Sequence, residues 1–142
     1  NRLHKQGRIW TISRSVPDKA AYLELCKSAI LEFNSRVTLD DGTWGEFTDG
    51  IKFVNMDFEK PQGYEKLQKK LKGTDRQRIF YCALHSKLYP TIAKQLADCG
   101  LITQVSRIVL EKPIGSDYES GALINKCMAE YFSESQTSLC AY

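Results

Sequence analysis

One stretch decides the fold class of this chain: Arg107-Ile108-Val109-Leu110-Glu111-Lys112-Pro113-Ile114-Gly115. A short apolar run rich in β-branched residues ends abruptly in an acid, an ammonium group and a turn-forming proline. This pattern predicts a buried strand that carries Lys112 at its carboxyl end. Ligands of open α/β sheets bind at the carboxyl ends of the strands, so a lysine there can reach the phosphate of a substrate or cofactor.

The residues after this stretch predict a helix. Ser116-Asp117-Tyr118-Glu119 fits the capping-box pattern, with Ser116 as the cap. Apolar residues then recur at helical spacing, at Leu123, Ile124, Cys127, Met128 and Tyr131. Strand, lysine, turn and capped helix together form a βα unit with a lysine at the carboxyl end of its strand.

Strand-like and helix-like segments alternate through the rest of the chain. Runs rich in β-branched and aromatic residues predict strands at 8–13, 51–56 and 78–84. Helical spacing predicts a helix after each strand: Ser15 caps the first, Pro61 opens the second, and Gly100 ends the third. This alternation predicts a parallel α/β sheet with right-handed crossovers.

Two local predictions complete this picture. The run at 78–84 is nearly all apolar, so we expect that strand near the centre of the sheet, with both faces covered. The polar segment at 40–44 lacks the spaced carboxylates of a calcium loop, and we predict a turn there.

Composition excludes several classes of protein. The chain has 142 residues, of which 42% are hydrophobic and 26% charged, as expected of one soluble domain. A net charge of +3 is too mild to indicate nucleic-acid binding, and no apolar run approaches the roughly twenty residues of a membrane helix. The five cysteines include no CxxC pair, and only His4 and His85 could assist them. We therefore predict reduced thiols, no metal site and a cytoplasmic location.

From about Arg2 to Gln136 the chain resembles the coenzyme-binding domain of glucose-6-phosphate dehydrogenase. Residues 111–115 are similar to that family's EKP-hydrophobic-Gly signature, 78–84 to its RIFYLAL strand, and 130–136 to the segment before its substrate motif. The resemblance implies a Rossmann-like parallel sheet with flanking helices. It divides the chain into a partial NADP-binding domain at 1–136 and an unmatched tail at 137–142.

The resemblance also implies a cofactor site, which begins at Arg14. The family places an arginine here on the 2′-phosphate of the cofactor, and paired guanidinium–phosphate hydrogen bonds would favour NADP over NAD. Asp57 and Phe58 match the pair that lies against the adenosine side in bacterial relatives. From the residues alone, Arg14 could equally be a surface arginine, and Asp57 a helix cap or turn residue.

The nicotinamide half of the cofactor is implied to lie along Ala83, Leu84 and Tyr89. Tyr89 could instead pack in the core from its helix. The paired prolines that usually follow Ala-Leu in the family are replaced by His85-Ser86, which adds two backbone donors and removes a rigid turn. We interpret His85 as a solvated loop residue, because no carboxylate is in view to orient it.

Lys112 resembles the family lysine that contacts both the cofactor and glucose 6-phosphate. An ammonium group can orient the sugar hydroxyl and offset its developing negative charge as hydride leaves the anomeric carbon. The alternative for Lys112 is a salt bridge with Glu111 at the end of the strand.

Several parts of the family pattern have no match. No GxxGDLA-type phosphate turn precedes the first strand, so the fold is expected to lack the first βα unit. The RIDHYLGK motif, the general-base histidine with its aspartate partner, and the substrate domain are also absent. In the Rossmann order the missing strand lies between the first and third strands of this chain. Open inner edges then predict low stability or aggregation.

The resemblance implies an oxidoreductase that converts glucose 6-phosphate to 6-phosphogluconolactone in the pentose phosphate pathway, as a homo-oligomer in its complete form. We expect little or no activity from this chain by itself, because the acid–base machinery is missing. Two alternatives stay open. The chain could be a non-catalytic nucleotide-binding or subunit-interaction module, or the product of a broken gene. Asn1 in place of an initiator methionine suggests a start further upstream.

Overall fold

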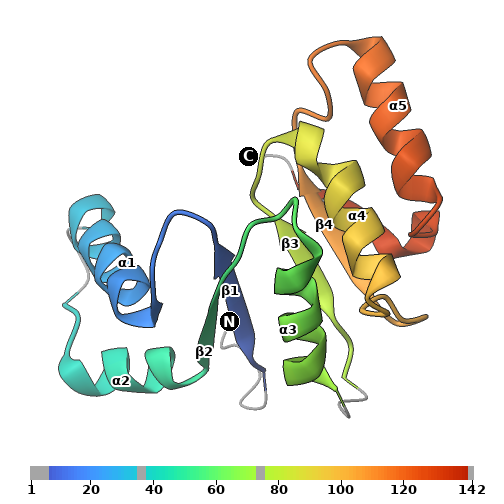
Figure 1. Cartoon of the computed structure of the whole chain (residues 1–142). Helices are drawn as coiled ribbons and strands as arrows, with labels where there is room; N and C mark the ends of the chain where they lie inside the picture. Colours follow the sequence, from blue (N-terminus) through green and yellow to red (C-terminus); the bar gives the residue numbers. More distant parts are fainter. Residues whose placement is uncertain (1–6, 35–37, 73–75, 141–142) are drawn as a thin grey trace. The chain divides into compact units, whose positions relative to one another are not determined.

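Two folded units make up the chain, Asn1–Asp57 and Phe58–Tyr142 (Figure 1). The structure is a computed structural model that describes residues 7–34, 38–72 and 76–140. His4 and positions 141–142 of the predicted tail lie outside the described residues.

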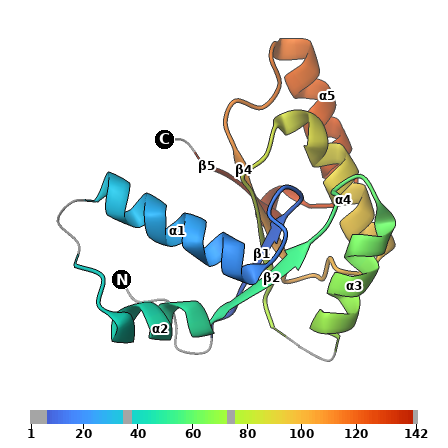
Figure 2. The ribbon, with the colours of Figure 1, turned by 60° about the vertical axis from the view of Figure 1, so that its left-hand side comes forward.

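The first unit is built on a parallel pair of strands, β1 (Ile9–Ser13) and β2 (Ile51–Asn55). Two helices connect the strands, α1 (Lys19–Phe33) and α2 (Asp41–Asp49), and Figure 2 shows all four elements. The ring of Tyr22 on α1 stacks on that of Phe53 on β2, with centroids 5.6 Å apart. Neither helix contains a buried residue. The unit therefore has little apolar core of its own.

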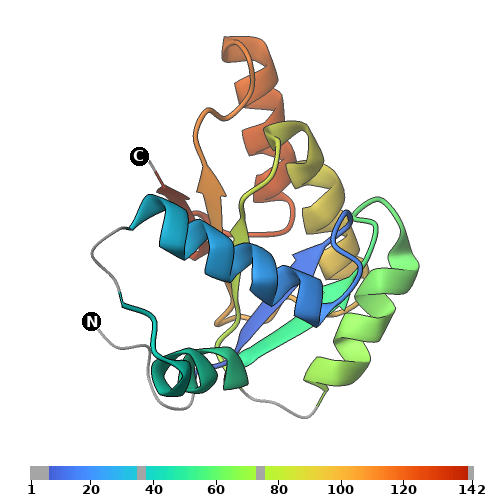
Figure 3. The same ribbon diagram turned by 90° about the vertical axis from the view of Figure 1, so that its left-hand side faces the viewer.

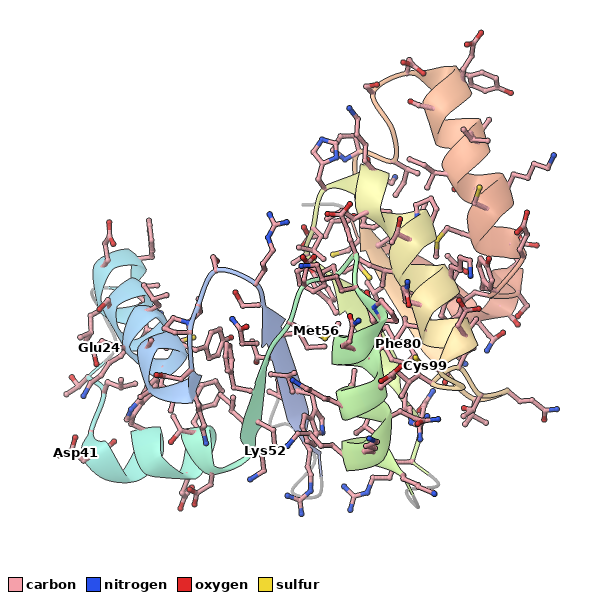
Figure 4. The ribbon with its side chains drawn as sticks, viewed as in Figure 1. Glu24, Asp41, Lys52, Met56, Phe80 and Cys99 are labelled. Atoms are coloured by element: carbon pink, nitrogen blue, oxygen red, sulfur yellow. The ribbon has the colours of Figure 1, made fainter. Side chains whose placement is uncertain are left out.

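Both helices of this unit differ from the prediction at their starts. The cap of α1 is Asp18, whose carboxylate accepts from the Ala21 amide at 2.9 Å, so the prediction of Ser15 was wrong. The residue before Pro17 is biased toward extended backbone, which delays the helix. The predicted turn at 40–44 was also wrong, because a helix begins there. Asp40 accepts from the Thr43 amide and caps α2, whose first residue, Asp41, is labelled in Figure 4.

The second unit contains a three-stranded parallel sheet in the order β3-β4-β5. Short 3₁₀ turns precede α4 and β5. In chain order the elements are α3 (Pro61–Leu71), β3 (Ile79–Cys82), η1 (Ser86–Leu88), α4 (Tyr89–Asp98), β4 (Arg107–Glu111), α5 (Tyr118–Ala129), η2 (Glu134–Gln136) and β5 (Thr137–Cys140).

Helices α4 and α5 run side by side in this unit, as Figure 3 shows. They supply buried apolar side chains, as does β4, on which Ile108 and Leu110 are 0% and 1% exposed. Phe80 of β3 meets Phe132 edge to face, with centroids 6.3 Å apart. Alternate residues of the strands therefore form the core with these helices.

The two faces of β3 differ, and this corrects the prediction of a central strand covered on both sides. β3 lies at one edge of its sheet, and Ile79 and Tyr81 are 62% and 53% exposed. Ile79 and Tyr81 alternate with Phe80 and Cys82, so they lie on the opposite face of the strand from the core. No other described strand pairs with the free edge of β3. Aggregation through this edge stays a prediction.

Helix ends in the second unit follow local chemistry. Gly100 has φ +62° and donates to the Ala97 carbonyl, which confirms it as the residue that ends α4. The capping box of α5 is formed by Asp117 and Ser120, one residue later than the predicted Ser116. Asp117 accepts from the Ser120 amide at 2.8 Å, and a carboxylate is a stronger acceptor than a hydroxyl.

The segment after Gln136 forms β5, which pairs with β4 in parallel. The boundary between 136 and 137 is therefore not an edge of the folded unit, although the sequence of the segment carries no recognised motif. Parallel strands with flanking helices confirm the Rossmann-like α/β class, here as two sheets.

Three further observations concern the described residues alone. All five cysteines are free thiols. No described helix combines the length and the apolar character needed to cross a membrane. Within the described ranges no three side chains of His, Cys, Asp or Glu gather as metal ligands.

Candidate functional site

The predicted site residues divide between the two units, at the carboxyl ends of the strands. Arg14 and Asp57 follow β1 and β2 of the first unit. The second unit holds the others, which are Phe58, Ala83, Leu84, Tyr89 and Lys112.

Arg14 is exposed directly after β1. Its backbone carbonyl accepts from the side-chain amide of Asn55 on β2 at 3.2 Å, and the same amide donates to the Val16 carbonyl at 2.7 Å. Asn55 therefore shapes the segment that carries the guanidinium group. Asp57, two residues after β2, is half-buried.

Phe58 is half-buried at the start of the second unit. Its carbonyl accepts from the hydroxyl of Tyr64 at 2.9 Å, and Tyr64 is 2% exposed on α3. Ala83 is exposed and Leu84 is half-buried, directly after β3.

Tyr89 joins the ends of two strands. Its side chain is 1% exposed, and its hydroxyl lies 3.3 Å from the Cys82 carbonyl and 3.2 Å from the Glu111 carbonyl. A phenol has one proton, so the two carbonyls share it. Burial raises the pKa of Tyr89, which keeps that proton in place. The ring packs in the core, and the hydroxyl is engaged by the two strand-end carbonyls.

Lys112 follows β4 and is exposed. Residues 112–115, which we call the Lys112 turn, connect β4 to the loop before α5. The Lys112 amide donates to the Cys140 carbonyl of β5 at 3.2 Å, and the Gly115 amide donates to the Ser86 side-chain oxygen at 3.2 Å. The Lys112–Pro113 peptide bond is cis. Both ends of the turn are thus attached to neighbouring elements.

Gly115 also packs against the first turn of α5. It has φ +82°, and a Cβ built on it would lie 2.5 Å from the Gly121 nitrogen. A Cβ on Gly121 would in turn lie 2.8 Å from the Ile114 carbonyl oxygen. Only glycine fits Gly115 without a shift of backbone.

Glu111 takes part in a cross-strand hydrogen bond. The phenol of Tyr81 on β3 donates to its carboxylate at 2.7 Å. This bond orients the Glu111 side chain by a partner on the neighbouring strand. The alternative of a salt bridge with Lys112 is therefore not needed to account for the orientation of Glu111.

Two nearby groups are unsuited to nucleophilic or acid–base chemistry. Burial raises the pKa of Cys82 to about 12, so its thiol stays protonated at neutral pH. His85 is exposed, as predicted, and its Nδ1 accepts from the Lys87 amide at 3.3 Å. A single imidazole used as a local cap lacks the orienting partner of a catalytic pair.

The structure adds four supporting residues that the sequence analysis did not assign: Asn55, Tyr81, Ser86 and Gly121. A signal existed for two of them. The resemblance drew attention to Ser86 as a departure from the expected proline pair, and Gly121 sits at the start of an amphipathic helix where glycine is unfavourable. Asn55 and Tyr81 form hydrogen bonds with residues that are distant in the sequence, and no local pattern predicts such pairs.

A cavity of about 440 Å³ lies elsewhere, near the amino end of β4, away from the strand ends that carry the predicted residues. Its lining consists of Gln77, Gln104, Val105, Ser106 and Arg107. It contains none of the predicted site residues.

Comparison with known proteins identifies the family. A model described as "Glucose-6-phosphate dehydrogenase, NAD binding domain" matches residues 1–138. The glucose-6-phosphate 1-dehydrogenase of Dickeya dadantii is 31% identical over 134 residues, which cover 94% of this chain. That of Gluconobacter oxydans is 34% identical over 128 residues, which cover 87%.

Solved structures of the same enzyme share the fold. Glucose-6-phosphate 1-dehydrogenase from Mycobacterium avium has a TM-score of 0.85 at 22% identity, over 94% of this chain and 28% of that one. A glucose-6-phosphate dehydrogenase in complex with its substrate glucose-6-phosphate has a TM-score of 0.78 at 23% identity, over 97% and 30%. The chain spans 27% of the Dickeya relative and 26% of the Gluconobacter relative. The predicted motifs, the fold and the family match over residues 1–138 agree. The chain therefore belongs to the dinucleotide-binding domain family of glucose-6-phosphate dehydrogenase.

Proposed function

We propose that this chain binds NADP as part of a glucose-6-phosphate dehydrogenase. The observation that carries the proposal is the exposed Lys112 at the end of β4, on a turn attached to two neighbouring elements, in a chain matched to this family over 1–138. The five free cysteines support a cytoplasmic location for it.

The proposed contacts are assigned residue by residue. The exposed guanidinium of Arg14 in the first unit suits a 2′-phosphate, which would select NADP over NAD. We assign Asp57 and Phe58 to the adenosine side. In the second unit the open backbone at Ala83 and Leu84 suits the nicotinamide half.

The proposed reaction oxidises glucose 6-phosphate to 6-phosphogluconolactone. Bound NADP supplies the hydride acceptor. Lys112 would orient the anomeric hydroxyl and offset the negative charge that develops as its proton leaves. Tyr89 would support Lys112 indirectly, since its hydroxyl donates to the carbonyls at the ends of β3 and β4. A homo-oligomer is the proposed state of the complete enzyme.

Binding can be tested on the chain itself. Amide chemical shifts of isotopically labelled protein would be followed while NADP or NAD is added. Arg14→Ala is expected to weaken NADP binding roughly ten-fold and to leave NAD binding unchanged. Arg8→Ala, an exposed arginine before the opposite end of β1, is the matched control. NADP binding that is insensitive to Arg14, or no binding at all, would overturn the proposal.

Turnover is tested by NADP reduction in the presence of glucose 6-phosphate. We expect binding without turnover from this chain, because it spans only 27% of the Dickeya relative that carries the enzyme's name. Turnover abolished in Lys112→Ala but kept in Lys126→Ala, an exposed lysine on α5, would instead assign the full activity to this chain.

A further inference from the structure

We propose that Ser86 is a positioning residue, whose side-chain oxygen holds the Lys112 turn in the conformation that presents Lys112 to a ligand. This inference rests on the proposed function for the ligand, and on the geometry of the chain for the contact. Ser86 lies on η1, between β3 and α4, and is 7% exposed.

The contact is a hydrogen bond from the Gly115 amide to Ser86 Oγ at 3.2 Å. It joins residues 29 positions apart in the chain, so it connects two strand ends rather than neighbours in a loop. The bond is part-buried, with Ser86 buried and Gly115 half-buried, so water competes less for the Gly115 amide than for an exposed one.

Packing complements this contact on the opposite side of Gly115. Gly115 is confined on its other side by Gly121, 2.5 Å from the position of a Cβ. The Gly115 end of the turn therefore has packing on one side and the hydrogen bond to Ser86 on the other, while the Lys112 amide donates to the Cys140 carbonyl at the opposite end. Without the Ser86 bond the Gly115 amide loses this partner, and the Gly115 end of the turn is held less tightly to the segment before α4.

The chemistry of Ser86 suits this contact. A serine hydroxyl can accept a hydrogen bond from a distant backbone amide, which an apolar side chain cannot do. Ser86 thereby attaches its segment to the Lys112 turn.

The test compares the wild type, Ser86→Ala and Ser86→Thr, which keeps the hydroxyl. Hydrogen exchange of the Gly115 amide is measured without ligand. Shift titrations then use two probes, nicotinamide mononucleotide for the second unit and adenosine 2′,5′-bisphosphate for Arg14. We expect Ser86→Ala to speed Gly115 exchange and to weaken nicotinamide mononucleotide binding, each roughly five-fold. Binding of the bisphosphate should not change, and Ser86→Thr should restore both properties.

Unchanged Gly115 exchange in Ser86→Ala would overturn the proposal. So would an equal loss of both probes, because that result indicates general destabilisation. If the wild type binds neither probe, the proposed function fails, and Gly115 exchange together with its rescue by Ser86→Thr still decides whether Ser86 holds the turn.

Discussion

The segment after β1 and the Lys112 turn after β4 both end a parallel strand in an exposed cation, yet they are held differently. Arg14 is held through its backbone by the exposed amide of Asn55. The Lys112 turn is held by a part-buried hydrogen bond to the Ser86 side chain and by the packing of Gly115. Water competes less for a part-buried hydrogen bond than for an exposed one, so we expect the second turn to be the more preorganised of the two. The difference teaches that similar strand ends can be held by contacts of different exposure.

Among the substitutions that test this comparison, we expect the largest effect on the free energy of unfolding at Gly115. Gly115→Ala should destabilise the second unit by about 3 kcal/mol, because the added Cβ meets the Gly121 backbone at a positive φ. Gly45→Ala in α2 is the matched control, since a Cβ there meets nothing within 4 Å. Urea unfolding monitored by circular dichroism measures both. Equal stability of the two variants would show that the Lys112 turn is not held by packing.

A smaller loss is expected when the link between β3 and β4 is cut. Tyr89→Phe removes the hydroxyl shared by the Cys82 and Glu111 carbonyls, and should cost about 1 kcal/mol in free energy of unfolding. Tyr118→Phe, at a side chain that is 89% exposed, should change little. Thermal unfolding of both variants gives the comparison. A Tyr89→Phe protein as stable as the wild type would show that the Tyr89 hydroxyl does not stabilise the link between β3 and β4.

Asn55 allows the same question to be asked of the first unit. Asn55→Ala should cost about 0.5 kcal/mol, because its hydrogen bonds are exposed and water replaces them readily. It should also weaken NADP binding about two-fold by loosening the segment of Arg14. Asn34→Ala, an exposed change in the same unit, is the control. A loss as large as that in Gly115→Ala would show that the two turns are equally rigid.

The smallest effect concerns pH at the start of α5, beside the Lys112 turn. The Ser120 amide, by donating to Asp117, lowers the pKa of this carboxyl below its ordinary value of 3.8. A lowered folded-state pKa means that the stabilisation is complete above the ordinary value and is lost as pH falls through the folded value. Asp117→Asn can cap without titrating, so the stability difference between it and the wild type should change between about pH 5 and pH 2. Parallel pH profiles of the two proteins would contradict this.

Much of the fold was readable because it depends on local periodicity. The strand before Lys112, the opening of α3 at Pro61 and the end of α4 at Gly100 all follow from patterns within a few residues. Errors arose where neighbouring residues compete for one role. Asp18 and Asp117 act as caps in place of Ser15 and Ser116, because short shifts in backbone conformation decide which side chain reaches the free amides.

The candidate site divides in the same way. Arg14 and Lys112 could be placed at strand ends from the sequence, since a strand that stops at a turn delivers its last side chains there. The partners that shape those ends could not be placed. Asn55, Ser86 and Tyr89 act on residues 22 to 41 positions away, and no local pattern encodes such a meeting.

The sequence by itself determined the α/β class, the alternation of the first four strands with helices, the family, and the two cations at strand ends. Tertiary structure alone decided that one face of β3 is exposed, that residues 137–140 complete the second sheet, and that Ser86 and Tyr89 contact the strand ends beside Lys112. The physical reason is the sequence separation over which each kind of interaction acts. Periodicity and capping act within one or two turns of chain, whereas strand pairing and buried hydrogen bonds join residues that only the folded backbone brings together.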